Sequence, residues 1–218
     1  MMKLSKINEG IYKYKGEYYT HNSCPGTTHH GEDIISEGGD EYRHWDPFRS
    51  KLGAFLKEHG ALPIRTDMDI LYLGAGDGTT VSYLSDFLSS GRIFGVEFSR
   101  RPYRNLLELS IKRDNIYPIL ADARKPDKYE DVVPLVDFIY QDVAQRDQCG
   151  IFMKNVWFLK EGYKGILAIK SRSIDVTRSP SEIYKEVEEN LTSNGFDVLE
   201  QVDIGRWQKD HRLFVVGK

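Results

Sequence analysis

The sequence predicts a doubly wound α/β protein that begins with a small β-rich module. Three observations predict this fold class. Short apolar strands alternate with helices from about residue 47, the chain ends in two strands with no helix between them, and residues 1–46 differ in composition. Alternating strands and helices form a parallel sheet, whereas two strands joined directly pair antiparallel. We therefore expect a β-rich N-terminal module at 1–46 and an α/β domain at 47–218.

Each element has its own local signal. Residues 1–46 are rich in Tyr, Gly, Thr and His, with short alternating runs between turn residues, which predicts an antiparallel sheet. Phe48, Leu52 and Leu56 follow a four-residue spacing that stops at Gly60, which predicts an amphipathic helix. Apolar runs predict strands at 69–74, 92–98, 115–122, 136–143 and 163–171, and an antiparallel pair at 196–205 and 212–218.

Helices are expected between these strands at 80–91, 100–113 and near 147–160. The last helix has explicit start and stop signals. Ser179, Pro180 and Glu182 form a capping box with proline at the first helical position, and Gly195 suits a left-handed cap at the end. The sum is a seven-stranded sheet that finishes in an antiparallel hairpin.

Composition narrows the class of protein. A chain of 218 residues supports one sizeable core, and no apolar run approaches the roughly 20 residues that span a bilayer. The N-terminus lacks a secretory pattern, and Cys24 and Cys149 alone form no disulfide framework, so we expect a cytoplasmic protein without membrane contact. The net charge of −3 gives no indication of a strongly basic RNA-coating surface, so any grip on nucleic acid comes from a local basic patch or from partners.

Glycines and acidic residues gather where the expected strands end, which is where open α/β sheets bind ligands. A glycine turn followed by an acidic residue about 20 positions later suits a dinucleotide as well as S-adenosylmethionine, and glycines can also serve packing alone. The candidate cofactor-binding residues are Gly74, Ala75, Gly76, Asp77, Thr79, Thr80, Glu97, Phe98, Asp122, Ala123, Asp142 and Gln145.

Three features favour S-adenosylmethionine over a nicotinamide dinucleotide. Asp77, inside the turn, would repel a pyrophosphate but not a cationic methionine end. Asp122 ends the third strand, where it can accept a hydrogen bond from an adenine amino group. The final hairpin resembles the arrangement in class I (Rossmann-like) methyltransferases.

Four further residues suit the methylation of a ribose 2′-hydroxyl, which must be oriented and relieved of its proton. Lysine in a partly desolvated site can hold the oxygen or accept the proton, and an adjacent aspartate orients it. Taken singly, each residue could equally be a solvated or capping group. The candidate catalytic set is Lys51, Asp142, Lys170 and His211.

The blocks FRSKL (48–52), YLGAGDGTT (72–80), VEFS (96–99), DVAQ (142–145), AIKSRSID (168–175) and DHRLFVVG (210–217) resemble the fibrillarin family, from about residue 10 to the C-terminus. Without a glycine–arginine-rich tail, the chain is similar to the archaeal fibrillarin-like proteins. The resemblance implies an S-adenosylmethionine-dependent RNA 2′-O-methyltransferase that modifies rRNA and tRNA in an archaeal cell. It also implies that Lys51, Asp142, Lys170 and His211 are catalytic. The turn reads GAGDGT, where many members have GAASGT.

The resemblance further implies a box C/D ribonucleoprotein, with a guide RNA, a Nop-family scaffold protein and a kink-turn-binding ribosomal-protein-like subunit. Such delivery needs only a local basic rim, for which the candidates are Arg43, Arg49, Arg172 and Arg178. Cys24, His29 and His30 lack a second ligand pair, so no metal is expected. Two alternatives stay open: an NAD-linked oxidoreductase, and a non-catalytic assembly subunit that kept the cofactor fold.

Overall fold

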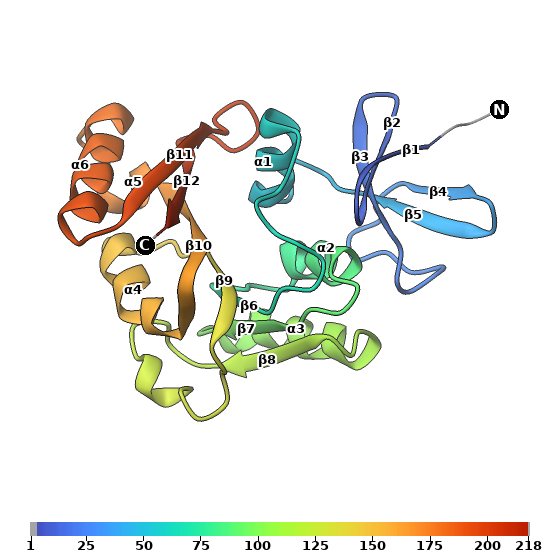
Figure 1. The fold of residues 1–218 in the computed structure, drawn as a ribbon, viewed down its shortest axis with the longest axis horizontal. Coiled ribbons are helices and arrows are strands. Elements are labelled where there is room, and N and C mark those ends of the chain that lie inside the picture. Colours follow the sequence, from blue (N-terminus) through green and yellow to red (C-terminus); the bar gives the residue numbers. More distant parts are fainter. Residues whose placement is uncertain (1–3, 218) are drawn as a thin grey trace.

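A computed structural model describes residues 4–217, so Met1, Met2, Lys3 and Lys218 lie outside the described residues. The chain forms two sheets, one from the strands before residue 46 and one from the strands after it (Figure 1). The strands are β1 (Ser5–Asn8), β2 (Ile11–Tyr14), β3 (Glu17–His21), β4 (Ile34–Glu37), β5 (Asp40–His44), β6 (Ile70–Leu73), β7 (Ile93–Glu97), β8 (Ile116–Leu120), β9 (Val136–Gln141), β10 (Leu159–Lys170), β11 (Asp197–Asp203) and β12 (His211–Gly217).

The helices flank the larger sheet (Figure 1). They are α1 (Lys51–His59), α2 (Thr79–Phe87), α3 (Arg100–Lys112), α4 (Gln148–Asn155), α5 (Ser171–Ile174) and α6 (Pro180–Ser193), with short 3-10 turns η1 (Pro126–Lys128) and η2 (Val156–Phe158). No helix within residues 4–217 has the length and apolar character needed to cross a membrane.

The larger sheet has the strand order β11-β12-β10-β9-β6-β7-β8, and the smaller one the order β1-β2-β3-β5-β4. In the larger sheet, β12 runs antiparallel to both β10 and β11, while the other pairs are parallel. The predicted fold class is therefore confirmed. The carboxyl ends of the parallel strands β6, β7, β8, β9 and β10 lie at one edge of this sheet, which is where open α/β sheets bind ligands.

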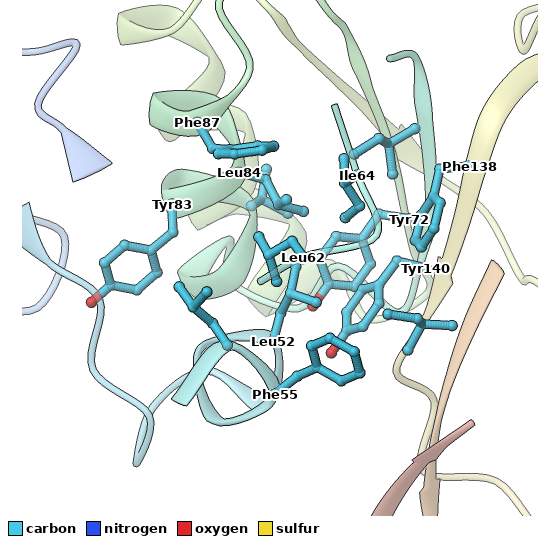
Figure 2. Packing of buried hydrophobic residues seen from close by; sticks show 14 of the residues in the cluster. Leu52, Phe55, Leu62, Ile64, Tyr72, Tyr83, Leu84, Phe87, Phe138 and Tyr140 are labelled. Atoms are coloured by element: carbon cyan, nitrogen blue, oxygen red, sulfur yellow. The ribbon is translucent and has the colours of Figure 1, made fainter. Parts of the chain in front are cut away.

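Alternating strand residues supply the two cores on the two faces of this sheet. In β6, Ile70 and Tyr72 join the cluster that contains α1 and α2, whereas Leu71 and Leu73 join the cluster under α4 and α6. Figure 2 shows the first cluster, where Leu52 and Phe55 of α1 lie over Tyr72 and Tyr140. Because successive strand side chains point to opposite faces, both sets are buried, which is why these strands read as continuous apolar runs.

The N-terminal sheet packs onto the same core. The Trp45 ring stacks on Tyr83 of α2 with centroids 5.3 Å apart, and its indole N–H donates to the Ser50 hydroxyl over 3.0 Å. Gly53 is required beneath it, because an added Cβ would lie 2.6 Å from the Trp45 ring. The module is thereby fixed to α1 and α2.

Several elements differ from expectation: the helix expected at 80–91 ends at Phe87, and the short helix α5 was not expected. The Ser50 side chain accepts a hydrogen bond from the Gly53 amide, so α1 begins at Lys51, and Phe48 stays 63% exposed instead of joining the buried face. The helix expected near 147–160 ends at Asn155, and β10 begins at Leu159 with an irregular register before Lys164. The capping box at Ser179 and the left-handed Gly195 are as predicted.

Candidate active site

The glycine turn after β6 brings two strand ends into close contact. Gly74 has φ +82°, and an added Cβ would lie 2.3 Å from the Asp142 carbonyl oxygen. Only glycine therefore fits at this position, for conformational and steric reasons together. The Gly74 amide donates to Val96 and the Asp142 amide to Leu73, which fixes the ends of β6, β7 and β9 relative to one another.

A cavity of about 340 Å³ opens at this edge of the sheet. Most of the predicted cofactor-binding residues line it, from four successive strand ends. They are Gly74, Gly76, Glu97, Phe98, Asp122, Ala123, Asp142 and Gln145. Such a volume is in the range of small-molecule sites, and the walls combine apolar side chains with a few carboxylates.

Two of these carboxylates are held in fixed orientations. Glu97 accepts hydrogen bonds from the Gly76 amide over 2.9 Å and from the Ser99 amide over 2.6 Å. Asp122 forms a two-pronged ion pair with Arg124, which also lines the cavity. Hydrogen bonds from the Arg124 side chain hold the pKa of Asp122 below its usual range, although burial acts in the opposite direction. Asp122 is thus an ionised acceptor at neutral pH, and hydrogen bonds hold both carboxylates in position.

Four predicted cofactor-binding residues do not line the cavity. Ala75 is buried, and Thr80 is buried against Ser50, with hydroxyl oxygens 3.0 Å apart. The Asp77 carboxylate accepts from the Thr79 amide and hydroxyl over 3.2 and 2.8 Å. Asp77 lines a separate cavity beside His29 and His30, and not the cavity in which it was expected to face the cationic methionine end of the cofactor.

The Lys51 ammonium and the Asp142 carboxylate form an ion pair of 2.8 Å at the edge of this cavity. Each side chain is 21% exposed, so both are largely removed from water. Lys51 is the first residue of α1, and Ser50, which caps that helix, also bonds Trp45 and Thr80. The hydrogen bonds of Ser50 therefore fix the position of the Lys51 backbone, from which its side chain extends.

Lys170 and His211 are directly paired neighbours on β10 and β12. The Gln148 side chain clamps the Lys170 backbone, accepting from its amide over 3.0 Å and donating to its carbonyl over 3.2 Å. Within the described chain, the Lys170 ammonium has no ion pair or hydrogen bond of its own, in contrast to Lys51. Lys170 is thus a positioned cation that is available to a bound molecule.

His211 is 8% exposed, and its environment favours the neutral ring. Burial is the main cause that lowers the pKa of His211; the Lys51 and Lys170 charges act in the same direction, and Asp142 partly offsets them. Its Nδ1 lies 2.7 Å from the Lys209 carbonyl oxygen, which can only accept. Nδ1 therefore carries the proton, and Nε2 of the neutral ring has a free lone pair.

The prediction that Arg43 contacts RNA is wrong. Its guanidinium is fully buried, where it pairs with Asp86 over 2.7 Å and Glu32 over 3.1 Å and lies over the Tyr83 ring. Arg113 pairs with the same Asp86. Burying an arginine requires such partners, and none of them could be identified from the local sequence.

The other three arginines are at the surface. Arg49, which precedes Lys51 by two residues, is 53% exposed and lies 3.7 Å from Asp46. Arg172 lies 3.6 Å from Asp210 and donates to the Val176 carbonyl over 2.7 Å, close to Lys170 in the chain. Arg178 pairs with Glu186 of α6. The structure brings Arg49 and Arg172 near the catalytic candidates and ties Arg178 to α6.

Sequence reasoning missed several residues of this site. Gln148, which holds Lys170, has no motif of its own, and Arg124 was not recognised as a partner of Asp122. The spacing of Asp122 and Arg124 in ADARKP, an acid and a base two positions apart at a strand end, was the available signal. Apolar residues such as Val143 and Ile151 also line the cavity, and they can be identified only once the fold is known.

The antiparallel last strand in a seven-stranded sheet and a carboxylate-lined cavity at the strand ends together define the class of S-adenosylmethionine-dependent methyltransferases. A family model described as Fibrillarin matches residues 2–218. The chain belongs to the fibrillarin family.

Individual relatives agree over nearly the whole length. A fibrillarin-like rRNA/tRNA 2′-O-methyltransferase from Methanocaldococcus jannaschii is 44% identical, with 98% of this chain and 96% of the relative covered. The structure of Aeropyrum pernix fibrillarin with natively bound S-adenosyl-L-methionine has a TM-score of 0.87 and 40% identity, covering 99% of this chain and 100% of that one. A fibrillarin in complex with Nop5p has a TM-score of 0.88 and 37% identity, covering 96% and 98%.

Proposed function

We propose that the protein transfers a methyl group from S-adenosylmethionine to ribose 2′-hydroxyls of rRNA and tRNA, as the catalytic subunit of a box C/D guide RNA particle. The observation that carries the proposal is the Lys51–Asp142 ion pair at the edge of the cavity, with Lys170 and His211 from the neighbouring strands. The activity named for the relative from Methanocaldococcus jannaschii supports it.

The residues of the cavity suit S-adenosylmethionine. Gly74 and Gly76 leave the backbone accessible, and the Glu97 and Asp122 side chains offer acceptors for ribose hydroxyls and an adenine amino group. The related Aeropyrum protein holds this cofactor. When bound, S-adenosylmethionine supplies an electrophilic methyl group on a positively charged sulfur. Asp142, which also lines the cavity, extends from this site to Lys51.

We assign each of the four catalytic candidates a separate role in methyl transfer. Asp142 fixes the Lys51 ammonium, which can hold the ribose oxygen as negative charge develops on it. Lys170, without a protein partner in the described chain, can do the same from β10. The free Nε2 lone pair of His211 is the neutral acceptor of the set, so we assign it the hydroxyl proton. The protein thereby acts mainly by positioning.

Target choice and delivery come from partners in this proposal. The net charge of −3 offers few phosphate contacts, which is adequate where a guide RNA pairs with the target. A Nop-family scaffold docks the protein, which is supported by the related fibrillarin that assembles with Nop5p. A kink-turn-binding subunit completes the particle. Arg49 and Arg172, beside the catalytic candidates, are the proposed RNA contacts.

The test is transfer of labelled methyl to an RNA target paired with a box C/D guide, with the scaffold and kink-turn proteins supplied. The matched control target has a 2′-deoxy sugar at the guided position. We expect label with the ribose target only. Label that survives the deoxy substitution would assign another acceptor atom, and cofactor binding without any transfer would identify a non-catalytic assembly subunit.

A further inference from the structure

A second cluster of chemistry-bearing side chains lies behind the glycine turn. His29 and His30 from the loop before β4 face Asp77 of the turn, and one possible ligand atom from each residue lies within 4.8 Å of the others. The His30 Nε2 atom is 3.8 Å from an Asp77 carboxylate oxygen. These residues line a cavity of about 350 Å³ that is separate from the one lined by Gly76.

One nitrogen of this cluster has no partner. The Nε2 atom of His29 is buried and makes no hydrogen bond within residues 4–217. A buried polar atom left without a partner loses its hydration without compensation, so such atoms are rare in folded proteins. A histidine ring nitrogen that has no hydrogen-bond partner can bind a metal ion.

Hydrogen bonds fix the backbone that carries the two histidines and the orientation of the Asp77 carboxylate. The Glu32 carboxylate accepts from the backbone amides of His29 and His30 over 2.8 and 3.1 Å. One oxygen of Asp77 is occupied by Thr79, which leaves the other oxygen directed at His30. Hydrogen bonds to a carboxylate, such as those from Thr79 to Asp77, orient the ligands in metal sites.

We propose that His29, His30 and Asp77 form a binding site for a late first-row divalent cation, with zinc as the preferred ion, which ties the N-terminal module to the glycine turn. Two imidazoles and a carboxylate are a common zinc ligand set, with water in the fourth position. Zinc bonds of about 2.0–2.2 Å require ligand atoms roughly 3.3–3.6 Å apart, so the three groups need to close by about 1 Å. His30 then exchanges its contact with the Thr79 hydroxyl, now 2.5 Å, for the metal.

This site differs from the one that the sequence suggested and dismissed. Cys24 lines the same cavity, but its thiol bonds the Lys112 carbonyl over 3.1 Å, and it is absent from the cluster of possible ligands. The missing ligand comes instead from Asp77, 47 or more residues further along the chain by the numbering of the sequence. Glu108, Lys112 and Arg113 also line the cavity, and Arg113 is already paired with Asp86.

The test uses the full-length, tag-free chain titrated with CoCl₂ and ZnCl₂. Cobalt binding is followed by visible absorption of the tetrahedral ion, and zinc by displacement of cobalt and by the melting temperature. We expect one ion per chain and a zinc-dependent rise in melting temperature of several degrees. The variants His29→Gln, His30→Gln and Asp77→Asn should each weaken binding by about tenfold or more.

Two matched variants separate this site from adventitious binding. His21→Gln removes an exposed histidine outside the cluster, and Cys24→Ala removes the neighbouring thiol. Both should bind cobalt as the unmodified chain does. The proposal is overturned by binding that survives His30→Gln, by binding that is lost in Cys24→Ala, or by no binding at micromolar metal. Because His30 is 25% exposed, its variant remains informative even where His29→Gln folds poorly.

Discussion

The Lys51 ammonium lies 2.8 Å from the Asp142 carboxylate although 91 residues separate them in the chain. Their meeting depends on two local features. Ser50 caps α1 and places Lys51 at its first position, while Gly74 permits the Asp142 backbone to approach the end of β6. The pair therefore joins the helix that precedes the sheet to the edge where the cavity opens.

Lys51→Met tests the role of this pair in methyl transfer. We expect kcat to fall by about 100-fold or more because the ribose oxygen loses an oriented cation, while cofactor affinity changes little. Guided transfer at saturating S-adenosylmethionine measures the first quantity and calorimetry the second. Lys57→Met is the matched control, since Lys57 lies on the same helix but pairs with Glu17, and it should retain activity. Equal losses in the two variants would refute a specific role for Lys51.

Asp86→Asn tests the buried ion-pair network that replaced the expected RNA contact of Arg43. Asp86 pairs with both Arg43 and Arg113, and neither its side chain nor that of Arg43 is exposed. Removing its charge leaves two buried arginines underpaired, so we expect a loss of about 3–5 kcal/mol in the free energy of unfolding by urea. Asp67→Asn, in an exposed pair with Arg65, should cost less than about 1 kcal/mol. Similar small losses in both variants would contradict the network's role.

The fold was predictable because its signals are local. Continuous apolar strands, capping at Ser179 and Gly195, and the absence of a helix before β12 each depend on neighbouring residues. Errors arose where a distant contact decided the outcome. Phe48 has the right spacing for a buried helix face, but the Ser50 cap starts α1 after it.

The site was predictable to the extent that strand ends define it. Glu97, Asp122 and Asp142 follow from strand order, so their shared cavity could be expected. The direction in which each side chain points could not be predicted from the sequence. Asp77 belongs to the same turn as Gly76 but faces His29 and His30, and Arg43 pairs with Asp86 on α2. Both outcomes depend on how the N-terminal sheet packs, which no local pattern encodes.

Gly74→Ala tests the close approach between β6 and β9. Gly74 and Gly16 have nearly the same φ, +82° and +84°, but a Cβ at Gly16 meets no atom within 4 Å. Gly16→Ala should therefore cost only the left-handed strain of about 1–2 kcal/mol. Gly74→Ala should cost more, because the Asp142 backbone must move, and it should also weaken S-adenosylmethionine binding. Denaturant unfolding and calorimetry measure the two effects; equal stability losses would show that the approach to Asp142 is unimportant.

His211 should make stability depend on pH in a defined direction. Burial, with the Lys51 and Lys170 charges, lowers the pKa of His211 below its usual 6.5 in the folded protein. Between that lowered value and about 6.5 the unfolded chain binds the extra proton, so the free energy of unfolding falls as pH falls. Above about pH 7 the ring is neutral in both states and the penalty vanishes.

The comparison is between the unmodified chain and His211→Gln, unfolded by urea from about pH 8 down to about pH 5. The other titrating groups, His29 among them, act alike in both proteins, so the unmodified chain should lose more stability on acidification. Parallel curves would mean that His211 does not titrate below its ordinary pKa.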